Sequence, residues 1–573
     1  MSTEADSLPK PLLLLIALAQ GLVLLLLHQA IEFKFWPGGN YPWLFCFYAM
    51  VTVGPLMLLL SLETGDQWKR IVPWVVPFTL VAGVLGYYTG GQVLPEPYIG
   101  YSNVAMVFGF TLAIATFKAL MYAQQRATGE PFQYSFLFQF SWRNFLILGL
   151  SLLFTLAVWG ILMLWGALFE VININFFMDL FTERWFYYPA LALAHGFGVI
   201  IFRSQSKVID TVTRIQQALM KFLLVFLVLV SVLFLAALPF TGLAPLWETG
   251  NGSMLILWMQ GIILFFLNAV YQDDPESRPY PDPVHRFIYI GIALLPVYSA
   301  IAFYGLWLRV EQYGWTPARS WGFLVWAFFA LFSIGYLWGI IRLRDHWLRH
   351  LSWVNVRLGL LVLATMLLIN SPLLDFRKIS VSSQMNRLAS GEMEPDDIDL
   401  YYFRRNLARP GYEALQELKP RIAETHPEIA EQIDNWYTSQ SPQRQDFGRE
   451  YLLESLELYG GTSIPESLED ALYDFADQNR WRLSGPGDLL LLQVDMDGNG
   501  QDDYVLIESQ SGYRYATLFY RAVDGWHFSN MTPSFSPSLT GDSLQESLEK
   551  GRWQTIDPRW RKLDIGGNVF IVQ

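Results

Sequence analysis

The sequence predicts an all-α polytopic membrane bundle of about 11 transmembrane helices, followed by a soluble α+β C-terminal domain. Of the 573 residues, 53% are hydrophobic and 16% are charged, whereas about one quarter of an average soluble protein is charged. The charge is also unevenly distributed. Residues 1–374 carry 20 Lys and Arg against 18 Asp and Glu, and residues 375–573 carry 19 against 33. We therefore expect a nearly neutral membrane body at 1–374 and an acidic domain at 375–573.

Eleven segments of the apolar body are long enough to cross a bilayer, which takes about 20 residues. The first, Leu12–Ala30, is expected to be retained, because its apolar run is long for a signal peptide and no clear small-residue cleavage site follows it. The other ten segments are Pro42–Ser61, Ile71–Gly90, Val104–Ala123, Phe145–Phe169, Tyr187–Phe202, Leu219–Leu238, Met254–Tyr271, Phe287–Leu308, Trp321–Ile341 and Trp353–Ile369.

The basic residues of the connecting loops predict the orientation of the bundle. The loops after even-numbered segments, together with Lys221 at the start of the seventh segment, hold 13 Lys and Arg, and the loops after odd-numbered segments hold four. Basic loops stay in the cytoplasm, so the N-terminus is expected there. With eleven segments, residues 375–573 are expected outside the cytoplasm, and one segment more or fewer would reverse their side.

Two of the longer connections are rich in aromatic residues. PFQYSFLFQFSW at 131–142 alternates aromatic with polar residues, and VININFFMDLFTERWF at 171–186 is aromatic with a few charges. Both are expected either to lie along the membrane surface, with their rings at headgroup depth, or to pack as loops against the bundle.

Four stretches of the chain resemble an uncharacterised bacterial family of multi-pass inner-membrane proteins, catalogued as a domain of unknown function. They are LFTERWFYYPALALAHGFG at 181–199, FFLNAVYQDD at 265–274, IAFYGLWLRVEQYGWTPARSW at 301–321 and DPRWRKLDIGGNVF at 557–570. The resemblance implies a bacterial inner membrane and, with the orientation above, a periplasmic C-terminal domain. It brings no activity, substrate or catalytic residue.

Three polar residues inside the predicted spans form a candidate intramembrane site. His195 lies in the middle of its span between small residues, and Gln260 and Asn268 share another span. Polar groups at this depth often mark a substrate or proton pathway. The alternative is packing by interhelical hydrogen bonds, each contributing about 1 kcal/mol, and we favour it because no series of carboxylates accompanies these residues. Lys118 lies near a span end, where its ammonium can reach the interface.

The loop NAVYQDDPESRPYPDPVHR at 268–286 is a second, weaker candidate. It gathers five ionisable residues that could bind a metal ion or phosphate if they converged, but a solvated acidic loop is the simpler interpretation. These residues are Asp273, Asp274, Glu276, Asp282 and His285.

The pattern of the acidic domain changes from helical to extended along the chain. Residues 379–436 are rich in Leu, Ala, Glu and Arg and predict two or three helices. Another helix is expected near Glu450–Tyr459. After residue 487, short apolar or alternating segments separated by Gly or Asp predict a mostly antiparallel sheet.

The stretch VDMDGNGQDDYVLI at 494–507 is a candidate calcium loop. Oxygen-bearing side chains at alternate positions can point inward around a tight bend at Gly500, and hard oxygen ligands suit calcium. Leu506 replaces the bidentate Glu of an EF-hand and the flanks are strand-like, so a shorter calcium loop between two strands is expected. A polar hairpin turn is the alternative. The expected ligands are Asp495, Asp497, Asn499, Gln501 through its backbone carbonyl, and Asp503.

Three function classes fit this organisation. A permease-like or envelope-transport component with a calcium-stabilised external domain is favoured, because eleven spans exceed what an anchor needs. A scaffold or sensor that binds a protein partner through its C-terminal domain is the alternative. A membrane glycosyltransferase is disfavoured, because the first external loop holds Glu32 alone among acidic residues, and we expect no enzymatic activity. The acidic tail also argues against a nucleic-acid partner.

Overall fold

The computed structural model divides the chain into two compact units, Met1–Tyr437 and Thr438–Gln573. It describes residues 8–64, 67–95, 100, 102–248, 251–271, 279–344, 347–438, 452–453, 456–461, 463–478, 489–510, 513–522, 525–531, 551, 563–565 and 568–570.

Eleven helices of the described residues are long and apolar enough to cross a membrane, which confirms the predicted bundle. Each of the eleven expected segments lies on one of them. They are α1 (Lys10–Glu32), α2 (Tyr41–Ser61), α3 (Gln67–Gly91), α4 (Val104–Thr128), α5 (Tyr134–Glu170), α7 (Arg184–Ser204), α8 (Ser206–Thr241), α10 (Gly252–Val270), α11 (Asp282–Tyr313), α12 (Pro317–Leu343) and α13 (Leu348–Leu368).

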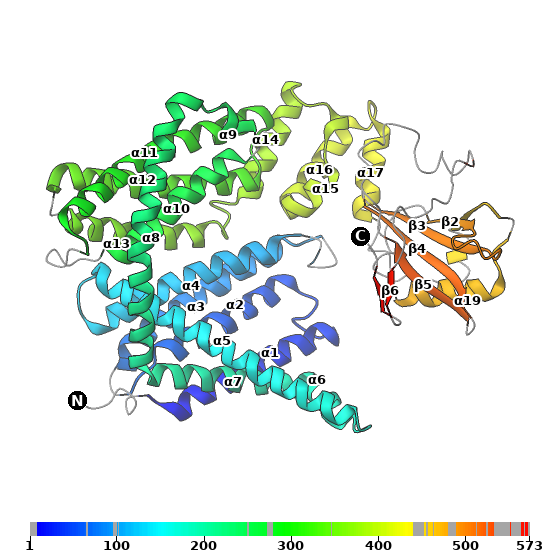
Figure 1. Ribbon diagram of the computed structural model, residues 1–573, viewed down its shortest axis with the longest axis horizontal. Helices are drawn as coiled ribbons and strands as arrows, with labels where there is room; N and C mark the ends of the chain where they lie inside the picture. The colour runs from blue at the N-terminus through cyan, green and yellow to red at the C-terminus, as the bar shows by residue number, and fades with distance from the viewer. Residues whose placement is uncertain are drawn as a thin grey trace. The chain divides into compact units, whose positions relative to one another are not determined.

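The spans form two helix groups with separate apolar cores (Figure 1). The first group contains α1–α4 and α7, and the second contains α8 and α10–α13. Helix α5 contributes Ile147 to the first core and Phe138 to the second. Helix α4 of the first group and helix α5 also pack against α13 of the second. These three helices therefore form the seam between the groups.

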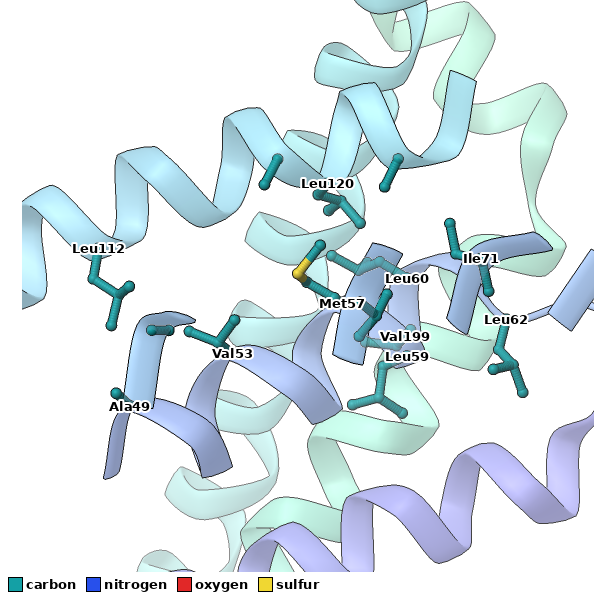
Figure 2. Close-up of a cluster of buried hydrophobic side chains, with 14 of the residues drawn as sticks. Ala49, Val53, Met57, Leu59, Leu60, Leu62, Ile71, Leu112, Leu120 and Val199 are labelled. Atoms are coloured by element: carbon teal, nitrogen blue, oxygen red, sulfur yellow. The ribbon is translucent and has the colours of Figure 1, made fainter. Parts of the chain in front are cut away.

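The core of the first group is built around α2. Figure 2 shows Val53, Met57 and Leu60 of α2 packed toward Leu120 of α4 and Val199 of α7. Met57 and Val199 are fully buried. Of the eleven candidate spans among the described residues, α2 has the largest buried share, and α1, α3, α4 and α7 all contact it, so this helix lies inside the group.

Close approach of α7 to its neighbours depends on glycine. A Cβ on Gly196 would lie 2.7 Å from the Cβ of Ala17 on α1, and one on Gly198 would lie 3.1 Å from the Cα of Ser151 on α5. The small residues beside His195 therefore let three helices pack closely, as such residues commonly do in membranes.

Both aromatic connections are partly helical. Residues 134–142 form the first turns of α5, so most of this stretch extends a span and is not a loop. Within 171–186, Phe176–Thr182 forms the short helix α6, which packs on α5 and α7. A second short helix, α9, covers Ala244–Glu248.

Helices that follow the last span pack on one end of the bundle. We call α14 (Phe376–Ser390), α15 (Leu400–Tyr402) and α16 (Ala408–Ile422) the cap, and α17 (Pro427–Thr438) follows them. Tyr88 near the end of α3 donates a hydrogen bond to Asp375 (3.1 Å), and the N–H of Trp315 donates to Ser383 (2.9 Å). Because of these contacts the compact unit continues to Tyr437, whereas the composition changes at 374/375.

The second unit is a small α+β domain, as the sequence predicts. Its five-stranded sheet has the order β1-β2-β3-β4-β5; β1 is parallel to β2 and the other neighbours are antiparallel. Leu468, Leu472 and Phe475 of the helix α19 pack on Leu491 and Phe519 of the sheet. The elements are β1 (Leu456–Tyr459), α19 (Glu466–Gln478), β2 (Leu489–Val494), β3 (Asp503–Gln510), β4 (Tyr513–Ala522), β5 (Gly525–Met531) and the separate pair β6 (Leu563–Ile565) and β7 (Asn568–Phe570).

The helix expected near Glu450–Tyr459 is wrong over its second half, because Leu456–Tyr459 is the strand β1. Its four residues pair in parallel with Leu489–Leu492 of β2. A four-residue segment has too little periodicity to distinguish strand from helix, so the partner strand decides the conformation.

Candidate functional site

A polar network joins three helices of the second group. Asn268 of α10 accepts hydrogen bonds at Oδ1 from the Asn355 side chain of α13 (2.7 Å) and from the Tyr336 hydroxyl of α12 (2.8 Å). Tyr336 also lies within hydrogen-bond distance of Asn355 Oδ1 and is fully buried. From α5, the Tyr134 hydroxyl donates to the backbone oxygen of Asn268 (2.7 Å). The network therefore fixes the seam between the two helix groups.

Beside this network lies a cavity of about 330 Å³. We call it the seam cavity, because α4 and α5 form one wall and α10 and α13 form the other. Its lining is mostly aromatic and aliphatic, with a few polar side chains, which is the usual composition of a small-molecule site. The lining residues are Phe117, Lys118, Met121, Tyr122, Tyr134, Leu137, Phe138, Ser141, Trp142, Phe145, Phe265, Asn268, Ala269 and Asn355.

Lys118 supplies the cationic group of the seam cavity. No hydrogen bond or ion pair within the described residues engages its ammonium, whereas Arg203 of α7 donates to the backbone oxygen of Leu59 (2.7 Å) and lies 3.8 Å from Glu63. An unpaired charge within a span is costly and marks a candidate for function. The site thus combines a cation, two amides and an aromatic wall.

The three intramembrane residues predicted from the sequence lie in different networks. His195 Nε2 lies 3.3 Å from Ser151 Oγ, between α7 and α5. Gln260 is fully buried and donates to Ser299 of α11 (2.6 Å) and Ser333 of α12 (2.8 Å). Of the three, Asn268 alone lines the seam cavity. The hydrogen bonds of His195 and Gln260 agree with the packing alternative.

Gln260 provides a test of that alternative. Replacing it with leucine is expected to lower the free energy of unfolding by about 1 kcal/mol, the usual contribution of an interhelical hydrogen bond. The cost stays small because Ser333 also donates to the backbone oxygen of Phe329 (2.6 Å) and remains satisfied. Unfolding of the purified protein in mixed micelles would measure this difference. A loss of function at unchanged stability would instead assign Gln260 to a pathway.

The loop at 268–286 lies partly outside the described residues, because Asp273, Asp274 and Glu276 fall there. Asp282 begins α11. His285 is buried, and its two ring nitrogens lie 2.8 Å from the Tyr271 hydroxyl and 2.6 Å from the Tyr289 hydroxyl. With both nitrogens engaged, His285 serves the packing of this end of the bundle.

The acidic loop of the second unit connects two antiparallel strands, as expected. Carboxylate oxygens of Asp495, Asp497 and Asp503 lie within 4.8 Å of one another. Asp495 accepts hydrogen bonds from the N–H groups of Gly498 (2.8 Å) and Gly500 (2.9 Å). Gly500 has a φ of 80°, a left-handed conformation that glycine adopts without strain. The loop therefore brings three of the five expected ligand residues to one point.

Hydrogen bonds within the loop hold the other two expected ligands close to this point. The N–H of Gln501 donates to Asn499 Oδ1 (2.7 Å), and Asn499 Nδ2 donates to Asp497 (2.9 Å). Both are short-range contacts of the kind that also stabilise polar turns. The geometry is thus compatible with a cation loop and with a turn.

The carboxylates of the loop differ in their electrostatic surroundings. The N–H of Gly500, assisted by other N–H groups, holds the pKa of Asp495 below its ordinary value. Burial raises the pKa of Asp503, and the negative charges of Asp497 and Asp495 raise it further. Asp503 would therefore gain most from a bound cation, which removes this repulsion.

Sequence reasoning missed part of the site. It treated Lys118 as an interfacial side chain and did not single out Tyr336 or Asn355. Asn355 stands seven residues after the start of α13 in WVNVRL, where an amide in a span was a usable signal. Tyr336 had no such signal, because tyrosines near span ends are common.

Together these features define a polytopic α-helical membrane protein with an amphipathic cavity between two helix groups. Residues 13–418 match the family described as Domain of unknown function (DUF4153). Since this match covers more than half of the chain, the protein belongs to that family. No curated protein matches the chain. No solved structure matches it either.

Proposed function

We propose that this protein is a permease-like component of a bacterial inner membrane and that the seam cavity is its substrate site. The location of the cavity carries the proposal. It lies where two helix groups with separate cores meet, and relative movement of two such groups is how many transporters expose one site to each side in turn. The cap helices pack on the opposite end of the bundle, so they are placed to control access from that side.

We further propose that the second unit is extracytoplasmic and that calcium stabilises it. Three carboxylates within 4.8 Å support the cation, and the basic loops support the side. Calcium is plentiful outside the cytoplasm, where sites with dissociation constants of about 10⁻⁴–10⁻³ M are filled.

An enzymatic role of the transferase kind gains no support from the first loop. Glu32, its acidic residue, forms an ion pair with Arg184 of α7. Glu32 is therefore engaged by an arginine, and no second acidic residue accompanies it in this loop. The support for the permease proposal therefore comes from the seam cavity.

Cysteine accessibility would test transport without knowledge of the substrate. Ser141 of α5 lines the seam cavity, and Cys46 is the single native cysteine. In a Cys46→Ala background, Ser141→Cys is expected to react with a membrane-impermeant maleimide from both sides of the membrane, in right-side-out and in inside-out vesicles. The reason is that a permease exposes its site alternately.

Leu156→Cys serves as the matched control, because Leu156 lies on the same helix and is 65% exposed on a span surface. This position faces lipid and is expected to react from neither side. Reaction of Ser141→Cys from one side alone would contradict the permease and favour the scaffold or sensor.

A further inference from the structure

The charge of the seam cavity is positive and unbalanced. Lys118 contributes one positive charge, and none of the lining residues, all within the described part of the chain, is acidic. The amide groups of Asn268 and Asn355 and the hydroxyl of Ser141 add neutral polar atoms. A ligand that fits this lining carries a negative charge close to Lys118, since opposite charges within a few ångströms stabilise each other strongly where water is scarce.

The depth of the Lys118 ammonium in the membrane is close to the depth of the lipid phosphates. Lys118 stands six positions before Gln124, where the polar end of α4 begins, which is about 9 Å along a helix. The other polar lining residues also lie toward this end: Asn268 is two residues from the end of α10, and Tyr134 begins α5. Lysine side chains at such a depth extend toward the headgroup layer.

The apolar part of the seam cavity opens toward the bilayer. Phe145 of α5 is 55% exposed and Phe265 of α10 is 54% exposed, although both line the cavity. On the surface of membrane spans, exposed side chains contact acyl chains. An apolar chain bound beside Lys118 could therefore leave the cavity between these two rings, whereas a water-soluble anion would gain nothing from them.

The same end of the bundle carries most of the basic loop residues. Helices α4, α10 and α12 all end here, and the loops and helix ends on this side hold 13 Lys and Arg against four on the other. Basic segments at a membrane surface attract anionic lipids. The loops thus raise the concentration of anionic headgroups where the cavity begins.

We propose that the seam cavity binds an anionic phospholipid-like amphiphile, with its phosphate against Lys118 and its chain directed outward between Phe145 and Phe265. This proposal names the substrate class of the site under the proposed function. A volume of about 330 Å³ accommodates a headgroup and the first part of one chain. The rest of the chain stays in the bilayer.

Binding of short-chain lipids to the full-length protein in a neutral detergent would test the proposal. The probes are dihexanoyl phosphatidylglycerol, dihexanoyl phosphatidylcholine and inorganic phosphate, each titrated by calorimetry. Phosphatidylglycerol is expected to bind the native protein about tenfold more tightly than phosphatidylcholine, and phosphate is expected not to bind measurably. Equal binding of the two lipids would overturn the role of charge. If phosphate bound as tightly as the lipid, the role of the acyl chain would be overturned.

Variants separate the cavity from the general surface. Lys118→Met is expected to remove the preference for phosphatidylglycerol, and Lys118→Arg is expected to retain it, because the arginine keeps the charge. Ser141→Leu is expected to weaken the binding of both lipids, because the larger side chain fills the cavity. If Lys118→Met still preferred phosphatidylglycerol to the same degree, the proposal would be overturned. The lipid comparison on the native protein needs no variant, so it holds even if a variant fails to fold.

Failure of this inference differs from failure of the proposed function. If Ser141→Cys reacts from both sides of the membrane but no lipid preference exists, the permease stands and the substrate class is wrong. If the lipid preference depends on Lys118 but Ser141→Cys reacts from one side, the cavity is a lipid site in a protein that does not transport.

Discussion

Replacing Asn268 with leucine is expected to lower the free energy of unfolding of the membrane bundle by about 2 kcal/mol. Its Oδ1 atom accepts hydrogen bonds from Asn355 (2.7 Å) and Tyr336 (2.8 Å), both of them buried. Leucine fills a similar volume, so the lost stability comes from the missing hydrogen bonds and not from a new cavity. The amide of Asn355 would then remain buried without its acceptor, which costs more than a hydrogen bond at the surface. Unfolding in bicelles followed by steric trapping would measure the difference.

Two further variants show whether the network acts as a unit. Asn268→Leu and Asn355→Leu are expected to be non-additive, because the second change removes the group that the first leaves unsatisfied. Phe265→Leu is the matched control: Phe265 lines the same cavity from the same helix but lies outside the network, and we expect a change within about 0.5 kcal/mol. Strictly additive losses would mean that the three residues do not form one network.

The fold of the bundle could be predicted from the sequence because its signal is local. Each span is a predominantly apolar run, and a helix in lipid must satisfy its own backbone groups. All eleven expected spans therefore correspond to helices. The ends were less predictable: α5 begins at Tyr134, eleven residues before the expected span starts at Phe145. Alternating aromatic and polar residues there fit a helix end as well as a surface segment.

The candidate site was less predictable because it depends on which helices become neighbours. Asn268 and Asn355 are 87 residues apart in the chain, and nothing in either span indicates that the other lies beside it. From the sequence His195 was the strongest of the three candidates, yet its partner Ser151 lies outside the lining of the seam cavity, as do the partners of Gln260. The acidic loop at 494–507 is the opposite case, since its five expected ligands fall within nine consecutive residues and local turns arrange them.

Calcium at about 10 mM is expected to stabilise the hairpin of β2 and β3 by about 1–3 kcal/mol, the range that mass action gives for a dissociation constant of about 10⁻⁴–10⁻³ M. The physical reason is that three carboxylates lie within 4.8 Å of one another and repel without a cation. Hydrogen exchange of peptides from 489–510 in the full-length chain would measure the gain in protection. Magnesium at the same concentration is the control, because its stricter octahedral geometry suits this loop less well.

The Asp503→Asn variant distinguishes a cation site from a polar turn. Its Oδ1 can still accept the hydrogen bond that Met496 N–H gives to Asp503 (3.0 Å), so a pure turn is preserved. In a calcium loop the variant is expected to lose the response to calcium. It is also expected to be more stable than the native loop in chelator, because it removes a buried charge facing two others. An unchanged calcium response would rule out Asp503 as a ligand.

The pH dependence of the hairpin has opposite signs with and without calcium. The pKa of Asp503 is raised in the folded domain by burial and by neighbouring charges, so in chelator the hairpin is expected to gain stability as pH falls through this raised value. The pKa of Asp495 is lowered in the folded domain, so this residue has the opposite effect on stability. Its contribution is lost at a lower pH, where protonation weakens its hydrogen bonds to Gly498 and Gly500. With calcium bound, protons compete with the cation for Asp503, and mild acid is expected to destabilise the hairpin. A polar turn without a cation site would follow one curve in both solutions.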